Sequence, residues 1–238
     1  MAMVRASCLL AVLLLCGCAP TTVAPEQMQS IRRVAMISAI GDKFTVKKVG
    51  LTVFGNEQQD FPIDSWGIDP FVINKVRSVL AGRFEVRPFA YQRAAFDTTG
   101  NNFSKIADAV RAQATSKDND AYIVVSKGAS QYGGTNQSVY GIGILEHSAL
   151  GTGVWIYALY WITVVDGHNF TVVANSSAFP LDQTVLSFEA IKGPSRKLDE
   201  SWMPTTLDAA QNIRLKSAVT DLLDRNLPGT IESLKLLQ

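Results

Sequence analysis

The sequence predicts a mixed α/β domain, in which helices pack on a mixed sheet, a long β-hairpin comes late and helices close the chain. Three observations predict this class. Short β-favouring runs alternate with helical periods between residues 33 and 125. The apolar run 154–165 is followed by Asp166-Gly167, a pair typical of hairpin turns. Apolar residues recur at helical spacing from residue 206 onward, so we expect residues 31–238 to form a single α/β domain.

The first half of this domain alternates strands and helices. Asp69 as N-cap and Pro70 at the first helical position predict a helix that ends before Gly82. A second helix is expected over residues 104–115 because apolar residues lie on one of its faces. The run 121–125 is apolar throughout, as in a strand that is buried on both sides. Further strands are expected at residues 33–39, 44–49, 51–54 and 84–89.

The second half has stronger β signals. Residues 128–153 hold seven of the seventeen glycines, which predicts a flexible excursion around one short strand at 139–145. The run 154–165 predicts one long strand, and residues 168–174 are its expected partner across a two-residue turn. Thr206 as N-cap predicts a helix, and Pro228 is expected to begin a second, shorter one.

The start of the chain predicts export. Arg5 precedes an aliphatic run at residues 6–15, and small residues follow. This order is typical of a secretory signal, and the run is shorter than the roughly 20 residues that a membrane-spanning helix needs. We therefore expect residues 1–17 to be a signal peptide and residues 18–30, which contain prolines and no apolar period, to be a flexible tether.

Leu15-Cys16-Gly17-Cys18 resembles the lipobox of bacterial lipoproteins, although Cys16 stands where that family usually has Ala, Ser or Thr. The resemblance implies that Cys18 is lipidated and becomes the first residue of the mature chain. Ala19 follows it, rather than the Asp associated with retention in the inner membrane, so the expected location is the periplasmic face of the outer membrane, with the inner membrane as the alternative. Cys18 would then be the sole cysteine of the mature protein, which excludes disulfides.

Charge argues against a nucleic-acid partner. The chain has 22 basic and 21 acidic side chains, and its longest basic blocks are Arg32-Arg33 and Lys47-Lys48. A nucleic-acid binder would carry a basic patch.

The layout of the domain is similar to the amino-terminal domain of TolB and to CsgG-like envelope lipoproteins. Three places carry the similarity: the strand at residues 33–39, the segment 83–89 and the hairpin 159–174. The resemblance implies an envelope domain that binds proteins, assembles or regulates, with no enzymatic chemistry and no cofactor. Two segments depart from it. Residues 43–61 predict an inserted strand pair, and residues 128–153 do not resemble a pore-forming hairpin.

Candidate catalytic residues are few. Ser130 follows Gly128-Ala129 as in a nucleophile elbow that lacks its second glycine, and only His147 and His168 could serve as its base. Gly141-Ile142-Gly143 begins a phosphate-loop pattern that ends in Glu146, so a strand is the better interpretation. No spacing supplies three metal ligands.

The aromatic residues Trp155, Tyr157 and Trp161 are expected to share one face of the long strand and are the candidate binding residues. We favour a role for these three residues in the hydrophobic core over a role in binding. The sequence therefore predicts a lipid-anchored, non-enzymatic lipoprotein that binds an envelope protein or serves as a scaffold. Two alternatives remain: a serine-type envelope hydrolase, and an oligomeric secretion-channel component whose 154–165 hairpin, about 40 Å long, crosses the bilayer.

Overall fold

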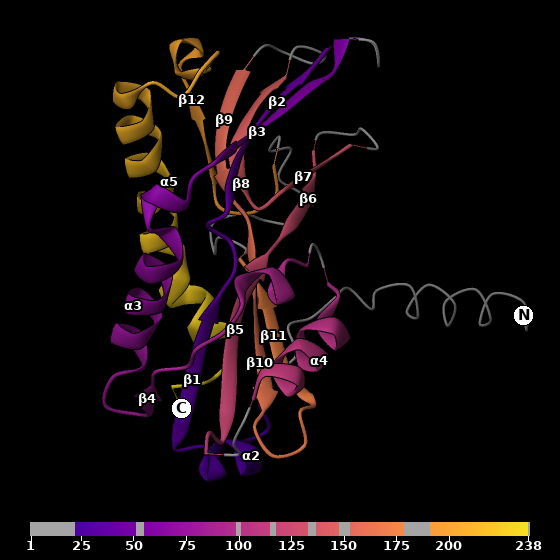
Figure 1. Ribbon diagram of the computed structural model, residues 1–238, viewed down its shortest axis with the longest axis vertical. Coiled ribbons are helices and arrows are strands. Elements are labelled where there is room, and N and C mark those ends of the chain that lie inside the picture. Colours follow the sequence, from indigo (N-terminus) through magenta and orange to yellow (C-terminus); the bar gives the residue numbers. More distant parts are fainter. Residues whose placement is uncertain are drawn as a thin grey trace, which may run out of the picture.

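The computed structural model describes residues 22–50, 55–98, 101–114, 118–132, 137–147, 153–178 and 191–237. It confirms the mixed α/β class. The strands divide between two five-stranded sheets that follow one another along the long axis of the molecule, with a small two-stranded sheet beside them (Figure 1). The signal segment, the lipobox, Cys18 and the expected strand 51–54 lie outside the described residues.

The first sheet has the order β11-β10-β5-β1-β4. Its strands are β1 (Arg33–Ser38), β4 (Glu85–Arg87), β5 (Ala121–Lys127), β10 (Tyr160–Asp166) and β11 (Val172–Ser177). β1 pairs in parallel with β4 and β5, whereas β10 pairs antiparallel with β5 and β11. Every residue of β5 is buried, which confirms the prediction for residues 121–125.

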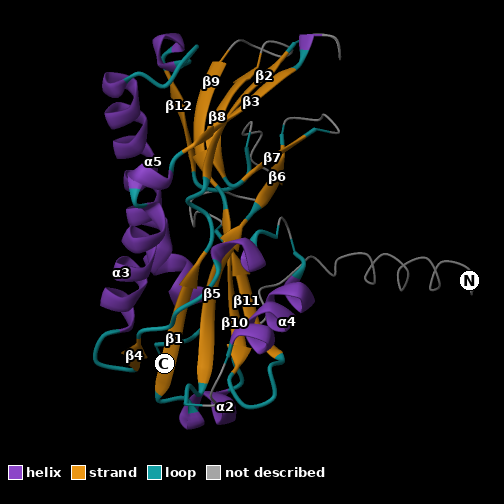
Figure 2. Cartoon of the chain, in the orientation of Figure 1, coloured by secondary structure: helices purple, strands orange, loops and turns teal. Residues whose placement is uncertain are grey.

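Successive residues of these strands point to opposite faces of the sheet and pack into two different hydrophobic cores. Val34 and Met36 of β1 pack with α3 (Ile68–Leu80) and with the long helix α5 (Ala209–Ser233). Ala35 and Ile37, on the opposite face, pack with α4 (Phe103–Gln113). The helices therefore cover both faces, with α3 and α5 on one side and α4 on the other (Figure 2).

The second sheet has the order β12-β9-β8-β2-β3. Its strands are β2 (Lys43–Val49), β3 (Glu57–Pro62), β8 (Ile142–His147), β9 (Gly153–Ala158) and β12 (Ser195–Leu198), and the two-stranded sheet pairs β6 (Ala129–Gln131) with β7 (Ser138–Tyr140). β2 and β3 form an antiparallel pair, as expected for residues 43–61. α5 contacts α3, β9 and β11, so one helix spans both sheets. Short 3₁₀ turns at Asp64–Trp66, Arg93–Phe96 and Glu200–Trp202 complete the fold.

The prediction of one long strand over residues 154–165 is wrong. It breaks at Leu159 into β9 of the second sheet and β10 of the first. Leu159 donates its N–H to the carbonyl of Gly141 at 2.7 Å and accepts from the N–H of Gly128 at 2.9 Å, so three chain segments meet at the break. Both halves are buried on both faces, and a run of this kind carries no alternation that would mark a boundary between sheets.

The predicted hairpin exists between β10 and β11, but its turn is longer than two residues. The N–H of Asp166 donates to the carbonyl of Thr171, and the Asp166 carboxylate accepts from the N–H groups of His168 and Asn169. The side chain of Asp166 thus builds a wider loop, and the returning strand begins at Val172 rather than at His168.

Three predicted helix boundaries are also corrected. Gly67, in the left-handed region at φ 64°, precedes α3, and Asp69 lies inside the helix with its carboxylate turned to β1. Asp208 rather than Thr206 caps α5 by accepting from Gln211 N–H at 2.8 Å. Pro228 lies within α5, which continues through it to Ser233 because Leu227 and Ile231 are both held in the core.

Two segments expected to be flexible are ordered where the structure describes them. Residues 25–30 form α2 (Pro25–Ser30), and Val23 and Met28 are buried in the main core, so the domain begins before residue 31. The described part of the glycine-rich region 128–153 contains three strands, β6, β7 and β8, rather than one. Backbone pairing, rather than side-chain burial alone, orders these residues.

Candidate binding site

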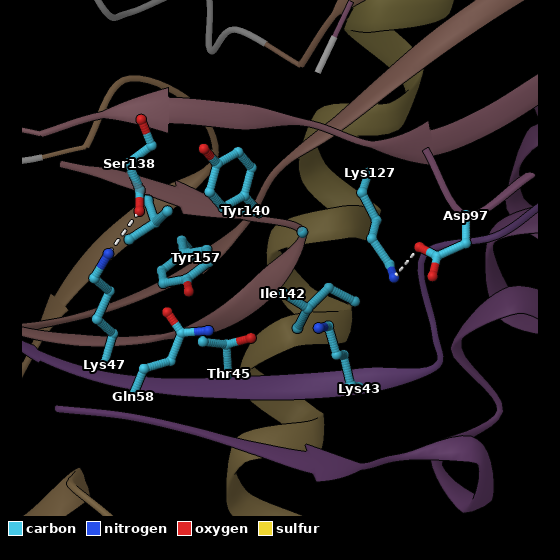
Figure 3. Close-up of a pocket in the computed structure, with 12 residues that line it drawn as sticks. Lys43, Thr45, Lys47, Gln58, Asp97, Lys127, Ser138, Tyr140, Ile142 and Tyr157 are labelled. Carbon is cyan, nitrogen blue, oxygen red and sulfur yellow. Dashed lines mark hydrogen bonds and ion pairs between the residues drawn. The ribbon is translucent and has the colours of Figure 1, made fainter. Parts of the chain in front are cut away.

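A cavity of about 230 Å³ lies between the second sheet and the two-stranded sheet, next to the end of β5 (Figure 3). It is lined mainly by polar side chains from β2, β3, β5, β7 and β9. The lining residues are Lys43, Thr45, Lys47, Gln58, Asp97, Lys127, Ser138, Val139, Tyr140, Gly141, Ile142 and Tyr157.

β2 supplies one wall. Lys43, Thr45 and Lys47 alternate along the strand and therefore point to the same face. Lys43 Nζ lies 2.7 Å from Asp60 Oδ2, and Thr45 Oγ1 donates to Asp60 Oδ1 at 2.8 Å. Burial alone would raise the pKa of Asp60, but the hydrogen bonds from Lys43 and Thr45 lower it below its usual value. Asp60 therefore carries a negative charge that Lys43 neutralises.

Lys127, the last residue of β5, closes one end of the cavity. Its side chain is 4% exposed, and its Nζ lies 2.6 Å from both Asp42 Oδ2 and Asp97 Oδ1. A buried ammonium group is costly unless it is paired. Two carboxylates satisfy this need, and they leave one negative charge in excess.

Lys47 lies at the other end and is paired differently. Its Nζ donates to the backbone carbonyl of Ser138 at 2.8 Å. Partial burial lowers its pKa below the usual value. Among the ion pairs of the described residues, none joins Lys47 to a carboxylate.

Tyr157 lies between these ends. The residue is fully buried, and its hydroxyl has no hydrogen-bond partner in the described part of the chain. Burial raises its pKa, and the nearby charge of Asp60 raises it further, so the hydroxyl stays protonated and able to donate. Gly143 makes room for it, because a Cβ there would collide with the Tyr157 hydroxyl and with the carbonyl of Thr45.

The structure brings together two of the three predicted aromatic residues. Trp155 and Tyr157 pack on one face of β9, and Lys197 lies 5.7 Å from the Trp155 ring. Trp161 lies beyond the break at Leu159, in the other sheet, where its ring centre is 5.0 Å from that of Phe103. Sequence reasoning missed the charged groups, although Lys43, Thr45 and Lys47 at every second position of a strand signal a polar face.

The residues of the alternative hydrolase hypothesis, Ser130, His147 and His168, are not among those that line this cavity. Ser130 Oγ donates to the Gln131 carbonyl at 3.0 Å and accepts from Lys192 N–H at 2.9 Å. His147 is buried against the Tyr132 ring, and burial lowers its pKa. His168 lies 4.0 Å from Asp120, which precedes the first residue of β5. Ser130 follows the other end of β5, so the length of this strand, about 20 Å, separates Ser130 from His168. No hydrogen bond joins Ser130 to either histidine among the described residues.

The described residues contain no group of three or more His, Cys, Asp or Glu side chains that could hold a metal. Within the same ranges, no helix combines the length and the apolar character needed to span a bilayer. The residues that line the cavity offer hydrogen bonds and charges, which are the means by which polar ligands are oriented.

No protein-family model and no curated protein sequence matches the chain. Solved structures with some similarity include a Xanthomonas campestris protein of domain-of-unknown-function family 330 (10% identity, 90% of this chain and 92% of that chain, TM-score 0.32). They also include the PelC dodecamer of Paraburkholderia phytofirmans, which is 13% identical over 89% of this chain and 94% of that chain, with a TM-score of 0.32. A third is a Helicobacter pylori homologue of a neuraminyllactose-binding hemagglutinin, which is 11% identical over 88% of this chain and 87% of that chain, with a TM-score of 0.34. TM-scores this low support no conclusion about function.

Proposed function

We propose that this protein is a lipid-anchored component of the bacterial cell envelope that acts by binding rather than by catalysis. The polar cavity between β2, β7 and β9 carries the binding half of the proposal, because it places charged groups and an unused hydroxyl donor around a space of about 230 Å³. Such groups fix a ligand or a partner segment in place without reacting with it.

The arrangement of Ser130 supports a non-catalytic role. A serine nucleophile needs a base within hydrogen-bond distance, whereas the Ser130 hydroxyl is engaged by the backbone of Gln131 and Lys192. If the purified protein hydrolyses ester, amide or glycan substrates and Ser130→Ala abolishes that turnover, this half of the proposal fails. We expect no turnover in either form.

The proposed anchor is a lipid on Cys18 of the lipobox, and Ala19 in place of Asp favours the periplasmic face of the outer membrane. The packed domain begins at or before Val23, so the link to a lipid on Cys18 is at most about five residues, or roughly 18 Å. The domain would therefore lie close to the membrane surface rather than on a long tether.

Membrane fractionation tests the anchor. Cys18→Ser should release a folded domain into the soluble periplasmic fraction, because the residue that accepts the lipid is lost. Cys16→Ser is the matched control, since Ser is usual at that lipobox position, and it should remain with the membrane. Retention of the Cys18→Ser protein in the membrane fraction would contradict the anchor.

A second candidate function is self-assembly as a scaffold, which the two edges of the second sheet favour. β3 exposes Glu57, whereas β12, at the opposite edge, exposes Lys197. Opposite charges on opposite edges suit a head-to-tail contact between copies. Sedimentation should then show a mass above the monomer that falls at high salt and in Lys197→Glu. A monomer at every salt concentration would remove this candidate.

A further inference from the structure

The charges around the cavity are balanced in total but unevenly placed. Lys43 and Asp60 neutralise each other. Lys127 contacts both Asp42 and Asp97, so that end has one negative charge in excess. Within the described ranges Lys47 Nζ is bonded to the Ser138 carbonyl and to no carboxylate, so the other end has one positive charge in excess. The cavity is thus polarised, with a net charge of zero.

The two ends are well separated. Lys43 and Lys47 are four residues apart on β2, which corresponds to about 13 Å along the strand. Figure 3 shows Lys43 on the side of Lys127 and Asp97, and Lys47 on the side of Ser138. A ligand that satisfies both ends must carry an anionic group and a cationic group several ångströms apart.

The hydroxyl of Tyr157 adds a directed donor between the ends. It points toward Gln58 and Thr45 in Figure 3, and no described residue bonds to it. A buried donor without an acceptor is costly to the free protein, and a ligand oxygen would relieve that cost. Gln58 belongs to the edge strand β3 and is exposed, so an incoming ligand can displace its side chain into solvent.

We infer that the cavity binds a small zwitterion of the size of a dipeptide. Its carboxylate would contact Lys47 and, once the Gln58 side chain is displaced, the Tyr157 hydroxyl, which is buried in the free protein. Its ammonium group would contact Asp97. A cavity of about 230 Å³ lies below the roughly 300–1,000 Å³ of sites that hold drug-sized ligands, which suits a ligand as small as a dipeptide. This inference rests on the proposed binding function and names its ligand class.

Calorimetric titration of the detergent-solubilised full chain with three peptides tests the inference. The probes are L-alanyl-L-alanine, its carboxamide, which lacks the carboxylate, and its N-acetyl form, which lacks the ammonium group. We expect the free dipeptide to bind and each capped form to bind at least about tenfold more weakly, since each loses one charge-assisted contact.

Variants assign the two ends. Lys47→Met should weaken dipeptide binding at least about tenfold. Lys48→Met is the matched control and should leave binding unchanged, because Lys48 lies on the opposite face of β2 and pairs with Glu146. Asp97 is half exposed, so Asp97→Asn should fold normally, and it should bind the free and the N-acetyl dipeptides equally.

Three results would overturn the inference: no dipeptide binding tighter than about 10 mM, equal binding of the carboxamide, or unchanged binding by Lys47→Met. Mass spectrometry of the titrated sample separates this failure from failure of the proposed function. Released alanine would mean that the protein is a peptidase, and the non-catalytic proposal would fall. If the dipeptide stays intact and does not bind, only the inferred ligand class is overturned, and the proposed non-catalytic function stands.

Discussion

At the residue scale, Asp120 links the start of β5 to the start of β1. Arg33 Nη2 lies 2.8 Å from Asp120 Oδ1, and the N–H groups of Arg32 and Arg33 donate to Oδ2 at 3.0 and 2.9 Å. The side-chain hydrogen bond from Arg33 is the main reason that the pKa of Asp120 falls to about 2, against an opposing effect of burial. The charged carboxylate therefore stabilises the folded state.

This pairing predicts a defined pH dependence. The folded pKa of about 2 lies below the unfolded value of 3.8, so the stabilisation is present above about pH 4 and is lost as the pH falls toward 2. Urea unfolding of Asp120→Asn should show a less stable protein near neutral pH, with a difference from the natural chain that shrinks below about pH 4. A difference that is constant with pH would contradict this assignment.

The binding site shows which residues could be predicted from the chain and which could not. Tyr157 is predictable as a candidate, because aromatic residues gather in the run 154–165. Lys47, Asp97 and Lys127 come from distant segments, and they meet only because β2 pairs in parallel with β8 while the end of β5 adjoins that pair. No local pattern encodes such a meeting.

At the element scale, the junction between the two sheets depends on close backbone contact. Gly128 follows β5 directly, and a Cβ at this position would lie 2.7 Å from Tyr160 N and 2.9 Å from the Leu159 carbonyl carbon. The glycine therefore allows the chain to cross the break between β9 and β10. The strands themselves were largely predictable from apolar runs, whereas this break was not, because burial on both faces hides the period of a strand.

Gly128→Ala tests the junction. The added methyl group meets backbone that cannot move aside without disturbing both sheets, so we expect a loss of about 1–3 kcal/mol in the free energy of unfolding. Urea denaturation measures it. Gly55→Ala is the control, since its Cβ would meet nothing closer than 3.4 Å. Equal effects of the two substitutions would show that the junction is not tightly packed.

At the scale of the whole molecule, α5 joins the two sheets into one unit. Its residues Val219, Leu223 and Leu227 belong to a core cluster that also contains residues of both sheets. Tyr160 of β10 and Thr230 of α5 are hydrogen bonded at 3.0 Å. The two sheets share this helix and this core, so neither buries its apolar face alone.

This sharing predicts a single unfolding transition. Trp155 reports on the second sheet and Trp161 on the first. In variants whose sole tryptophan is Trp155 or Trp161, with Trp66 and Trp202 also replaced, the urea midpoint measured by fluorescence should equal the midpoint measured by circular dichroism on the same variant. Fluorescence from one sheet that changes before the circular dichroism does would show that the sheets unfold separately.

The central claim is that the cavity is built to hold a ligand rather than to complete the fold. Tyr157→Phe tests it most directly, because the substitution removes the unpartnered hydroxyl and little else. Removing a buried donor that has no acceptor should leave the stability of the free protein unchanged or raise it by about 1 kcal/mol, as measured by urea unfolding. A loss of more than about 1 kcal/mol would show that the hydroxyl already has a partner in the free protein, and it would contradict the account.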